Sequence, residues 1–249
     1  MKEILCPSTI FKKWRHNSRV AGSHDKDMLI FPCPLPLALA TKMPLPSLIR
    51  TEFENIYPRT TEENDYNGVY NLLLLHAFPA TEGYVIHPYV ILTFLLPKFS
   101  MKLKTASQVA PPTAESHHSR DVLCFTLYFR VYFHRIPVFF LGSQTALAIE
   151  SSSYRTTVDD QMRLRMRELF DQSISEVHGI SALGTKLCFY CLDKKAESLT
   201  PRFIPRDTAY IKDVAPAHLW DSDLLTDDGY DRFMGIVQRV KARAADEGV

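Results

Sequence analysis

Two apolar, aromatic-rich runs separated by a short polar break constrain the fold of this chain most strongly. VLCFTLYFRVYF occupies residues 122–133 and IPVFFLG occupies residues 136–142, with His134 and Arg135 between them. Two such runs joined by a tight polar connection are typical of a β-hairpin. Because both runs are apolar almost without alternation, both faces of their sheet must be covered by other elements. We therefore expect a buried hairpin in a sheet with helices on either side.

The rest of the chain supplies these helices and further strands. Apolar residues recur at helical spacing in three segments, namely residues 65–78, 158–174 and 224–244. β-Branched and aromatic residues are concentrated in three other segments, where we expect one or two strands in residues 82–97 and one strand each in residues 177–184 and 185–193. The coarse order is α–β–β–β–α–β–β–α. It predicts an α/β fold in one domain, a mixed-sheet sandwich with flanking helices over residues 46–245.

Local signals indicate how two of these helices begin. Asp159 and Asp160 stand in the expected first turn of the helix at 158–174, where the helix dipole favours anions. Met162 and Met166 begin its expected buried stripe. Thr226 is the expected N-cap of the last helix.

Two segments lack the periodicity of the other elements. Residues 1–45 show no sustained helical or strand period, and their spaced prolines exclude a helix interior or a central strand. We expect a disordered N-terminal tail there. Residues 98–119 are polar and contain Pro111 and Pro112, which predicts a long surface loop inside the domain.

The composition excludes several classes of protein but does not identify a function. Apolar residues make up 46% of the 249 residues, so the chain as a whole is not disordered. The 29 Lys and Arg residues almost balance the 28 Asp and Glu residues, so net charge does not indicate a dedicated binder of nucleic acid or anionic membrane. The five cysteines are an odd number, and no apolar stretch reaches signal-peptide or membrane-spanning form. We expect a soluble intracellular protein of the cytoplasm or nucleus with no membrane partner.

Three segments in a fixed order carry a resemblance to a known group of proteins. They are DYNGVYNLLLLHAFP (65–79), IPVFFLGSQ followed by DDQMRLRM (136–166), and HGISALGTKLCFYCLD with LWDSDLLTDDGYDRF (178–233). In this order they resemble a large group of uncharacterised fungal proteins, mainly from mushroom-forming species, whose members are similar to PD-(D/E)XK nuclease-like domains. The resemblance covers about residues 48–245 and implies the restriction-endonuclease-like α/β fold.

The resemblance also implies where a nuclease site would lie. In this fold an acid on one central strand and a second acid on the next hold Mg²⁺, and a lysine two residues after the second acid positions the attacking water. The positions that resemble these three are Cys124, Gly142 and Gln144, while Gln161 resembles a helix residue that relatives direct at the site. Glycine offers no ligand, glutamine lacks the ammonium group, and cysteine suits Mg²⁺ poorly. We therefore expect a degenerate site and a non-catalytic binding or interaction module that needs no cofactor, with a partner that the sequence does not identify.

Two other interpretations stay open, an unrelated α/β domain and a Mg²⁺-dependent nuclease that uses displaced acids. Asp121 lies three residues before Cys124, so a strand would direct it to the opposite face. Glu150 follows the second apolar run beyond its expected end and is more typical of a solvated acid. Glu62 and Glu63 precede the first helix, where the dipole favours acids.

The cysteines and histidines that could bind a metal or take part in redox chemistry are equally consistent with structural roles. Cys188 and Cys191 form a C-x-x-C, but on a strand two residues three apart point to opposite faces, so we expect core cysteines. His117 and His118 fall in the expected loop without a nearby carboxylate. The sequence accordingly predicts no metal site.

Three arginines are candidates for binding nucleic acid. Arg163 and Arg167 share a helical face, and Arg155 lies upstream, so together they could meet a phosphate backbone. A solvated helix face explains them as well, because acids such as Glu168 are interleaved with them. Nucleic acid is therefore one candidate partner.

Overall fold

The predicted hairpin lies within the sheet and is buried along the second of its strands. The computed structural model describes residues 44–94, 123–206 and 212–248, and for residues 90–94 and 123–126 it describes the backbone alone. Strand β2 (Leu123–Phe133) pairs antiparallel with β3 (Ile136–Gln144). The two connecting residues, His134 and Arg135, both have positive φ, of 45° and 72°. Two such residues are the mark of a type I′ turn, whose twist matches that of the strands.

A seven-stranded mixed sheet extends from this hairpin on both sides. Its other strands are β1 (Tyr84–Phe94), β4 (Glu176–Leu183), β5 (Lys186–Asp193), β6 (Ser198–Thr200) and β7 (Ser222–Asp223). The path through the sheet is β1-β2-β3-β4-β5-β6, and β7 pairs with β5. All neighbours are antiparallel except β3 and β4, which are parallel. Parallel neighbours need a long crossover connection, and a helix supplies it here.

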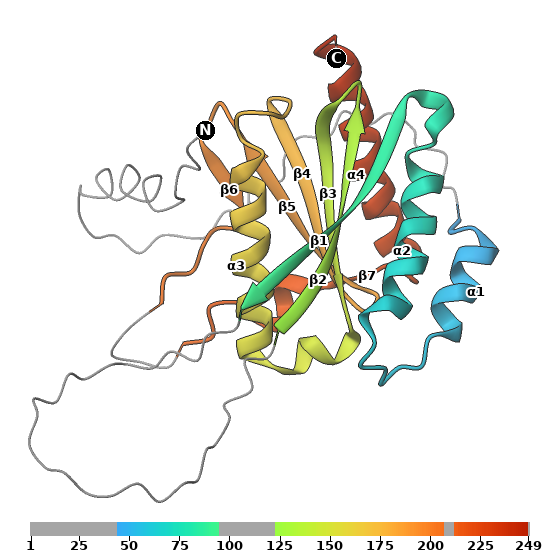
Figure 1. Ribbon diagram of the computed structural model, residues 1–249, viewed down its shortest axis with the longest axis vertical. Helices are drawn as coiled ribbons and strands as arrows, with labels where there is room; N and C mark the ends of the chain where they lie inside the picture. Colours follow the sequence, from blue (N-terminus) through green and yellow to red (C-terminus); the bar gives the residue numbers. More distant parts are fainter. Residues whose placement is uncertain (1–43, 95–122, 207–211, 249) are drawn as a thin grey trace, which may run out of the picture. The chain divides into compact units, whose positions relative to one another are not determined.

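Helices cover both faces of the sheet, as the apolar strands require (Figure 1). The crossover helix α3 (Ser152–Glu168) packs on one face together with the short helix η4 (Ala217–Trp220). The opposite face is covered by α1 (Ser47–Asn55), α2 (Glu63–Ala77) and α4 (Asp227–Asp246). The short helices η2 (Ala80–Glu82) and η3 (Ala146–Glu150) lie in connections. Two buried clusters, one on each face, form the core.

The mixed α/β class and the order of the predicted elements are confirmed. Thr226 caps α4, and its side chain accepts a hydrogen bond from the Gly229 backbone N–H. Met162 and Met166 are fully buried, as the helical stripe predicted. No helix in the described part of the chain is both long and apolar enough to span a membrane.

The helix predicted over residues 158–174 both begins and ends earlier in the structure, where α3 runs from Ser152 to Glu168. Helix α3 begins at Ser152, so Asp159 and Asp160 lie in its middle rather than in its first turn. Ser151 accepts a hydrogen bond from the Tyr154 backbone N–H and caps the helix two turns before the expected start. The Ser/Thr-rich segment therefore forms the first turns of the helix, with Ser151 as the stabilising N-cap and the Thr156 and Thr157 hydroxyls bonded to carbonyls one turn earlier.

Helical structure begins nearer the N-terminus than the sequence predicted. Helix α1 was not predicted, although it contributes the buried Ile49 and Phe53 to the core. Leu45, the last residue of the expected tail, is also buried in this core. The rest of the tail up to residue 43, and the expected loop at 98–119, lie outside the described residues.

Two glycines of α4 provide a matched test of this packing. A Cβ on Gly229 would lie 1.8 Å from the Asp223 carbonyl oxygen, whereas a Cβ on Gly235 would meet nothing within 4 Å. We expect Gly229→Ala to lower the free energy of unfolding by about 2 kcal/mol or more, because the backbone must move. Gly235→Ala should raise it by roughly 0.5–1 kcal/mol, since alanine is the better helix former. Urea unfolding of both variants measures the difference, and equal effects would contradict the docking of the α4 N-terminus described here.

Candidate functional sites

The strands that carry the nuclease-like positions are neighbours, but two of these positions are out of register. Gly142 on β3 pairs with Tyr128 on β2. Cys124 lies four residues before Tyr128 on β2, where its backbone pairs with Thr93 of β1. At the rise of a strand, four residues correspond to about 13 Å. Cys124 and Gly142 are thus on adjacent strands without facing each other, and the Cys124 side chain is outside the described part.

The space beside Gly142 is occupied by Tyr128. A Cβ on Gly142 would lie 2.5 Å from Cε1 of the Tyr128 ring, and the Met162 sulfur is the next group beyond it. The Tyr128 ring is buried and stacks on Phe140, with centroids 5.0 Å apart. Its hydroxyl donates a hydrogen bond to Gln161 Oε1 at 2.7 Å. The structure therefore joins Gly142 and Gln161 through an aromatic side chain that occupies the space beside Gly142.

The lysine-like position is also buried. Gln144 is 2% exposed, and its Oε1 accepts a hydrogen bond from the Tyr154 hydroxyl at 3.0 Å. Its Nε2 is buried without a hydrogen-bond partner among the described residues. The same Tyr154 hydroxyl lies 3.3 Å from Oε1 of Glu63, the first residue of α2. Glu63, interpreted from the sequence as a dipole-favoured acid, is thus held next to Gln144.

Burial dominates the electrostatics of Glu63. Desolvation raises the pKa of its carboxyl group above the ordinary value of 4.5, while the Tyr154 and Gln144 side chains act in the opposite direction. The other acids weighed as displaced ligands are not part of this cluster. Glu150 is exposed at the end of η3, and Asp121 lies outside the described residues.

Two of the three candidate nucleic-acid-binding arginines are turned into the domain. The guanidinium group of Arg155 donates to the carbonyls of Ile149 and Ala215 and pairs with Asp213. It is 6% exposed.

Arg163 is buried in a similar way. It pairs with Asp159 at 2.7 Å and donates to the Pro201 carbonyl, while the Tyr190 hydroxyl donates to the other Asp159 oxygen. Removing either charge from such a buried pair is costly, so Arg163 is engaged inside the protein. Of the three arginines, Arg167 alone is exposed.

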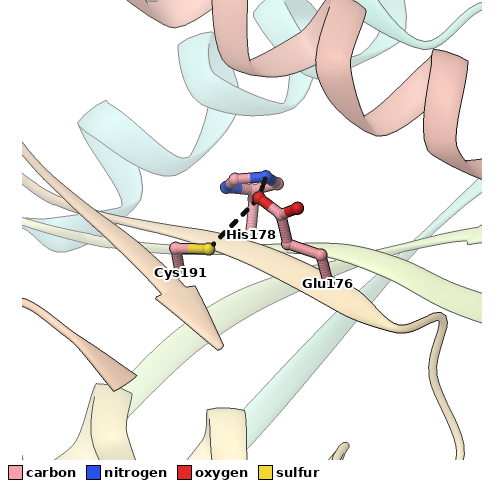
Figure 2. A group of neighbouring side chains, drawn as sticks. All are labelled: Glu176, His178 and Cys191. Atoms are coloured by element: carbon pink, nitrogen blue, oxygen red, sulfur yellow. Dashed lines mark hydrogen bonds and ion pairs between the residues drawn. The ribbon is translucent and has the colours of Figure 1, made fainter. Parts of the chain in front are cut away.

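A third group of polar side chains lies on the opposite face of the sheet (Figure 2). His178 of β4 pairs in register with Cys191 of β5, and Glu176 lies two residues before His178 on the same face. Glu176 Oε1 is 3.0 Å from His178 Nε2 and accepts a hydrogen bond from Cys191 Sγ at 3.4 Å. Among the described residues, this is the group of three His, Cys, Asp or Glu side chains whose ligand atoms could hold a metal ion.

The charges of this group are strongly perturbed. The adjacent His178 imidazole is the largest influence that lowers the pKa of Glu176 to about 2, and Arg243 of α4 contributes from 3.3 Å. Burial, followed by the Glu176 charge, raises the pKa of the Cys191 thiol to about 12. The carboxylate is therefore ionised and the thiol protonated at neutral pH in the absence of an ion.

The two cysteines of the C-x-x-C diverge, as predicted. Cys188 is buried on the α3 face, while Cys191 lies with Glu176 on the α4 face. The sequence prediction nevertheless missed the partners of Cys191. The two-residue turn Gly184-Thr185 sets the register that places His178 opposite Cys191, and this register could have been counted from the turn. His117 and His118 lie outside the described residues.

Comparison with known proteins does not assign a function to these residues. No protein-family model matches the chain, and neither the curated proteins nor the solved structures contain a significant match.

The surroundings of Glu63 predict a specific dependence of stability on pH. Well below pH 4.5, the ordinary pKa of a glutamate, the carboxyl group is protonated in both the folded and the unfolded chain. As the pH rises, the unfolded chain loses this proton first, because the folded pKa is raised. Ionisation of Glu63 therefore opposes folding, and Glu63→Gln should gain stability relative to the parent between pH 4 and pH 7.

Chemical denaturation at several pH values measures this difference. Glu54→Gln is the matched control, since Glu54 is an exposed carboxylate on the neighbouring helix α1. A relative stability of Glu63→Gln that stays constant or falls with rising pH would contradict the description of the Glu63 site.

Proposed function

We propose that this chain is a PD-(D/E)XK-like domain that has lost metal-dependent cleavage and acts as a non-catalytic binding or interaction module. The element order that the resemblance requires supports the proposal: a hairpin of two neighbouring strands, β2 and β3, is followed by helix α3 and a strand parallel to β3. The observation that carries the loss of catalysis is the Tyr128 ring lying over Gly142.

An aromatic ring at this place is incompatible with the chemistry of the family. Mg²⁺ needs oxygen ligands at about 2.0–2.1 Å and retains several waters. The strand face beside Gly142 offers instead Tyr128, Phe140 and Met162, all of them buried. Gln144, at the lysine-like position, is neutral and cannot supply an ammonium group. The residues at these positions therefore offer neither a carboxylate ligand nor an ammonium group, and the Tyr128 ring occupies the space that a side chain at position 142 would need.

One observation favours the second candidate function, a nuclease with a displaced acid. Glu63 is a half-buried carboxylate in the polar cluster around Gln144. Mg²⁺ is often bound through one or two carboxylates plus substrate phosphates, so a single acid does not exclude it. The two functions differ in whether Glu63 is required for cleavage.

A cleavage assay separates these functions. We expect no cutting of labelled single- or double-stranded DNA or RNA by the full chain with Mg²⁺ or Mn²⁺, because the metal lacks its ligands. Glu63→Gln is run in parallel under the same conditions. Cleavage by the parent chain that Glu63→Gln abolishes would establish the displaced-acid nuclease and overturn the loss of catalysis.

A metal-binding measurement tests the scaffold itself. Tyr128 and Gly142 are paired residues on adjacent strands, so Tyr128→Asp with Gly142→Glu would place two carboxylates opposite each other. We expect millimolar Mg²⁺ to raise the melting temperature of this double variant and to leave that of the parent unchanged, since an ion stabilises only a fold that binds it. Tyr128→Asn with Gly142→Gln is the uncharged control. An equal rise in the parent would contradict the empty metal site.

A further inference from the structure

We infer that Glu176, His178 and Cys191 form a binding site for a zinc ion on the α4 face of the sheet. This inference goes beyond the proposed function and does not depend on the nuclease resemblance. The three side chains come from two paired strands, β4 and β5, so the backbone that carries them is held by ladder hydrogen bonds. They project together on one face, as Figure 2 shows.

The spacing of the three ligand atoms suits a tetrahedral ion. With zinc bonds of about 2.0–2.1 Å to nitrogen and oxygen and about 2.3 Å to sulfur, neighbouring N and O ligands lie about 3.3 Å apart and O and S ligands about 3.6 Å apart. Here the corresponding distances are 3.0 Å from His178 Nε2 to Glu176 Oε1 and 3.4 Å from that oxygen to Cys191 Sγ. All three atoms lie within 4.8 Å of one another, so small side-chain rotations complete the geometry.

The His178 nitrogen provides a second, independent indication. His178 is 2% exposed, and its Nε2 makes no hydrogen bond to any described residue despite its closeness to Glu176 Oε1. A buried imidazole nitrogen without a hydrogen bond is costly. A shared cation satisfies both atoms, because each ligand then directs a lone pair at the ion rather than at the other atom.

The carboxylate is oriented for this role by a neighbour on α4. Arg243 contacts Glu176 Oε2, whereas Oε1 faces both His178 and Cys191. One carboxylate oxygen is thus held by Arg243, and the other is directed at the two further candidate ligands. Outer partners of this kind orient metal ligands and are as much a part of such sites as the ligands themselves.

The chemistry of the ligands selects the ion. Zinc binding would displace the Cys191 proton to solvent, so that the sulfur coordinates as a thiolate. A thiolate and an imidazole are preferred by zinc and are poor ligands for Mg²⁺ or Ca²⁺, which take oxygen. Three protein ligands leave a fourth position for water or a partner's side chain. Glu176 and Cys191 are only partly buried, so solvent reaches this position.

Zinc content of the full chain tests the inference, with the second cysteine of the C-x-x-C as a matched control. The chain is stripped with a chelator, reloaded with Zn²⁺, dialysed and analysed by elemental mass spectrometry. We expect Cys188→Ser to retain the zinc content of the parent, because Cys188 lies on the opposite face. Cys191→Ser and His178→Gln should each hold about one equivalent less. This comparison is insensitive to zinc bound elsewhere in the chain.

A spectroscopic readout guards against variants that fail to fold. Co²⁺ in place of zinc gives a near-ultraviolet thiolate-to-cobalt absorption band, which we expect in the parent and in Cys188→Ser and not in Cys191→Ser. Circular dichroism in chelator confirms that the compared variants are folded. Absence of the cobalt band in the parent, or equal zinc content in folded Cys188→Ser and Cys191→Ser, would overturn the inference. Neither result would affect the proposed loss of nuclease activity.

Discussion

The parallel pairing of β3 with β4 determines how the rest of this domain is arranged. Strands that follow each other in a hairpin are antiparallel, so a parallel pair forces the chain to cross over one face of the sheet. The crossover is α3, and its packing against β3 and β4 buries Met162 and Met166. The same crossover places Gln161 within reach of Tyr128 and Tyr154 within reach of Gln144. The hydrogen bonds from Tyr128 to Gln161 and from Tyr154 to Gln144 thus both follow from the parallel pairing of β3 with β4.

Burying α3 also fixes a pair of charges in the interior. Asp159 and Arg163 lie one turn apart, and both side chains are almost fully buried. Such a pair is tolerable only when its remaining hydrogen-bonding atoms are satisfied, and the Tyr190 hydroxyl and the Pro201 carbonyl provide this. An arginine on an amphipathic helix is ordinarily assigned to solvent or to a phosphate. Here the acid four residues earlier and a tyrosine from β5 give it an internal role.

How much of this could be predicted depended on whether the deciding contacts were local. Thr226 and the periodicity that follows it were sufficient to place α4, because an N-cap and a helical stripe are properties of neighbouring residues. The start of α3 was misplaced because Thr156 and Thr157 have low helix propensity. In the folded chain their hydroxyls donate to the carbonyls of Ser152 and Ser153, one turn earlier.

The candidate sites depended on contacts between strands, which become visible only when residues are counted outward from each hairpin turn. The space beside Gly142 is filled by Tyr128, fourteen positions earlier in the sequence, and this follows only from the register of the β2–β3 hairpin. The sequence motif pairs Cys191 with Cys188, whereas the side chains that lie beside Cys191 in the structure are Glu176 and His178. The two cysteines of a C-x-x-C on one strand point to opposite faces of the sheet. The side chains that contact each of them come instead from residues paired across neighbouring strands.

The same register separates the two sites from each other. Phe139 of β3 pairs with His178, and Gln144 pairs with Leu183, so the nuclease-like positions lie towards the end of these parallel strands and the Glu176 group lies at their beginning. Ser181, the partner of Gly142, is three residues or about 10 Å beyond His178, and Leu183, the partner of Gln144, is five residues or about 16 Å beyond it. Gln144 also bonds to α3, while Glu176 bonds to Arg243 of α4 on the other face. An ion held by Glu176, His178 and Cys191 would therefore lie on the opposite face of the sheet from the Tyr128 and Met162 side chains beside Gly142. The proposed zinc site and the proposed nuclease-like site are thus separate, and one can be tested without the other.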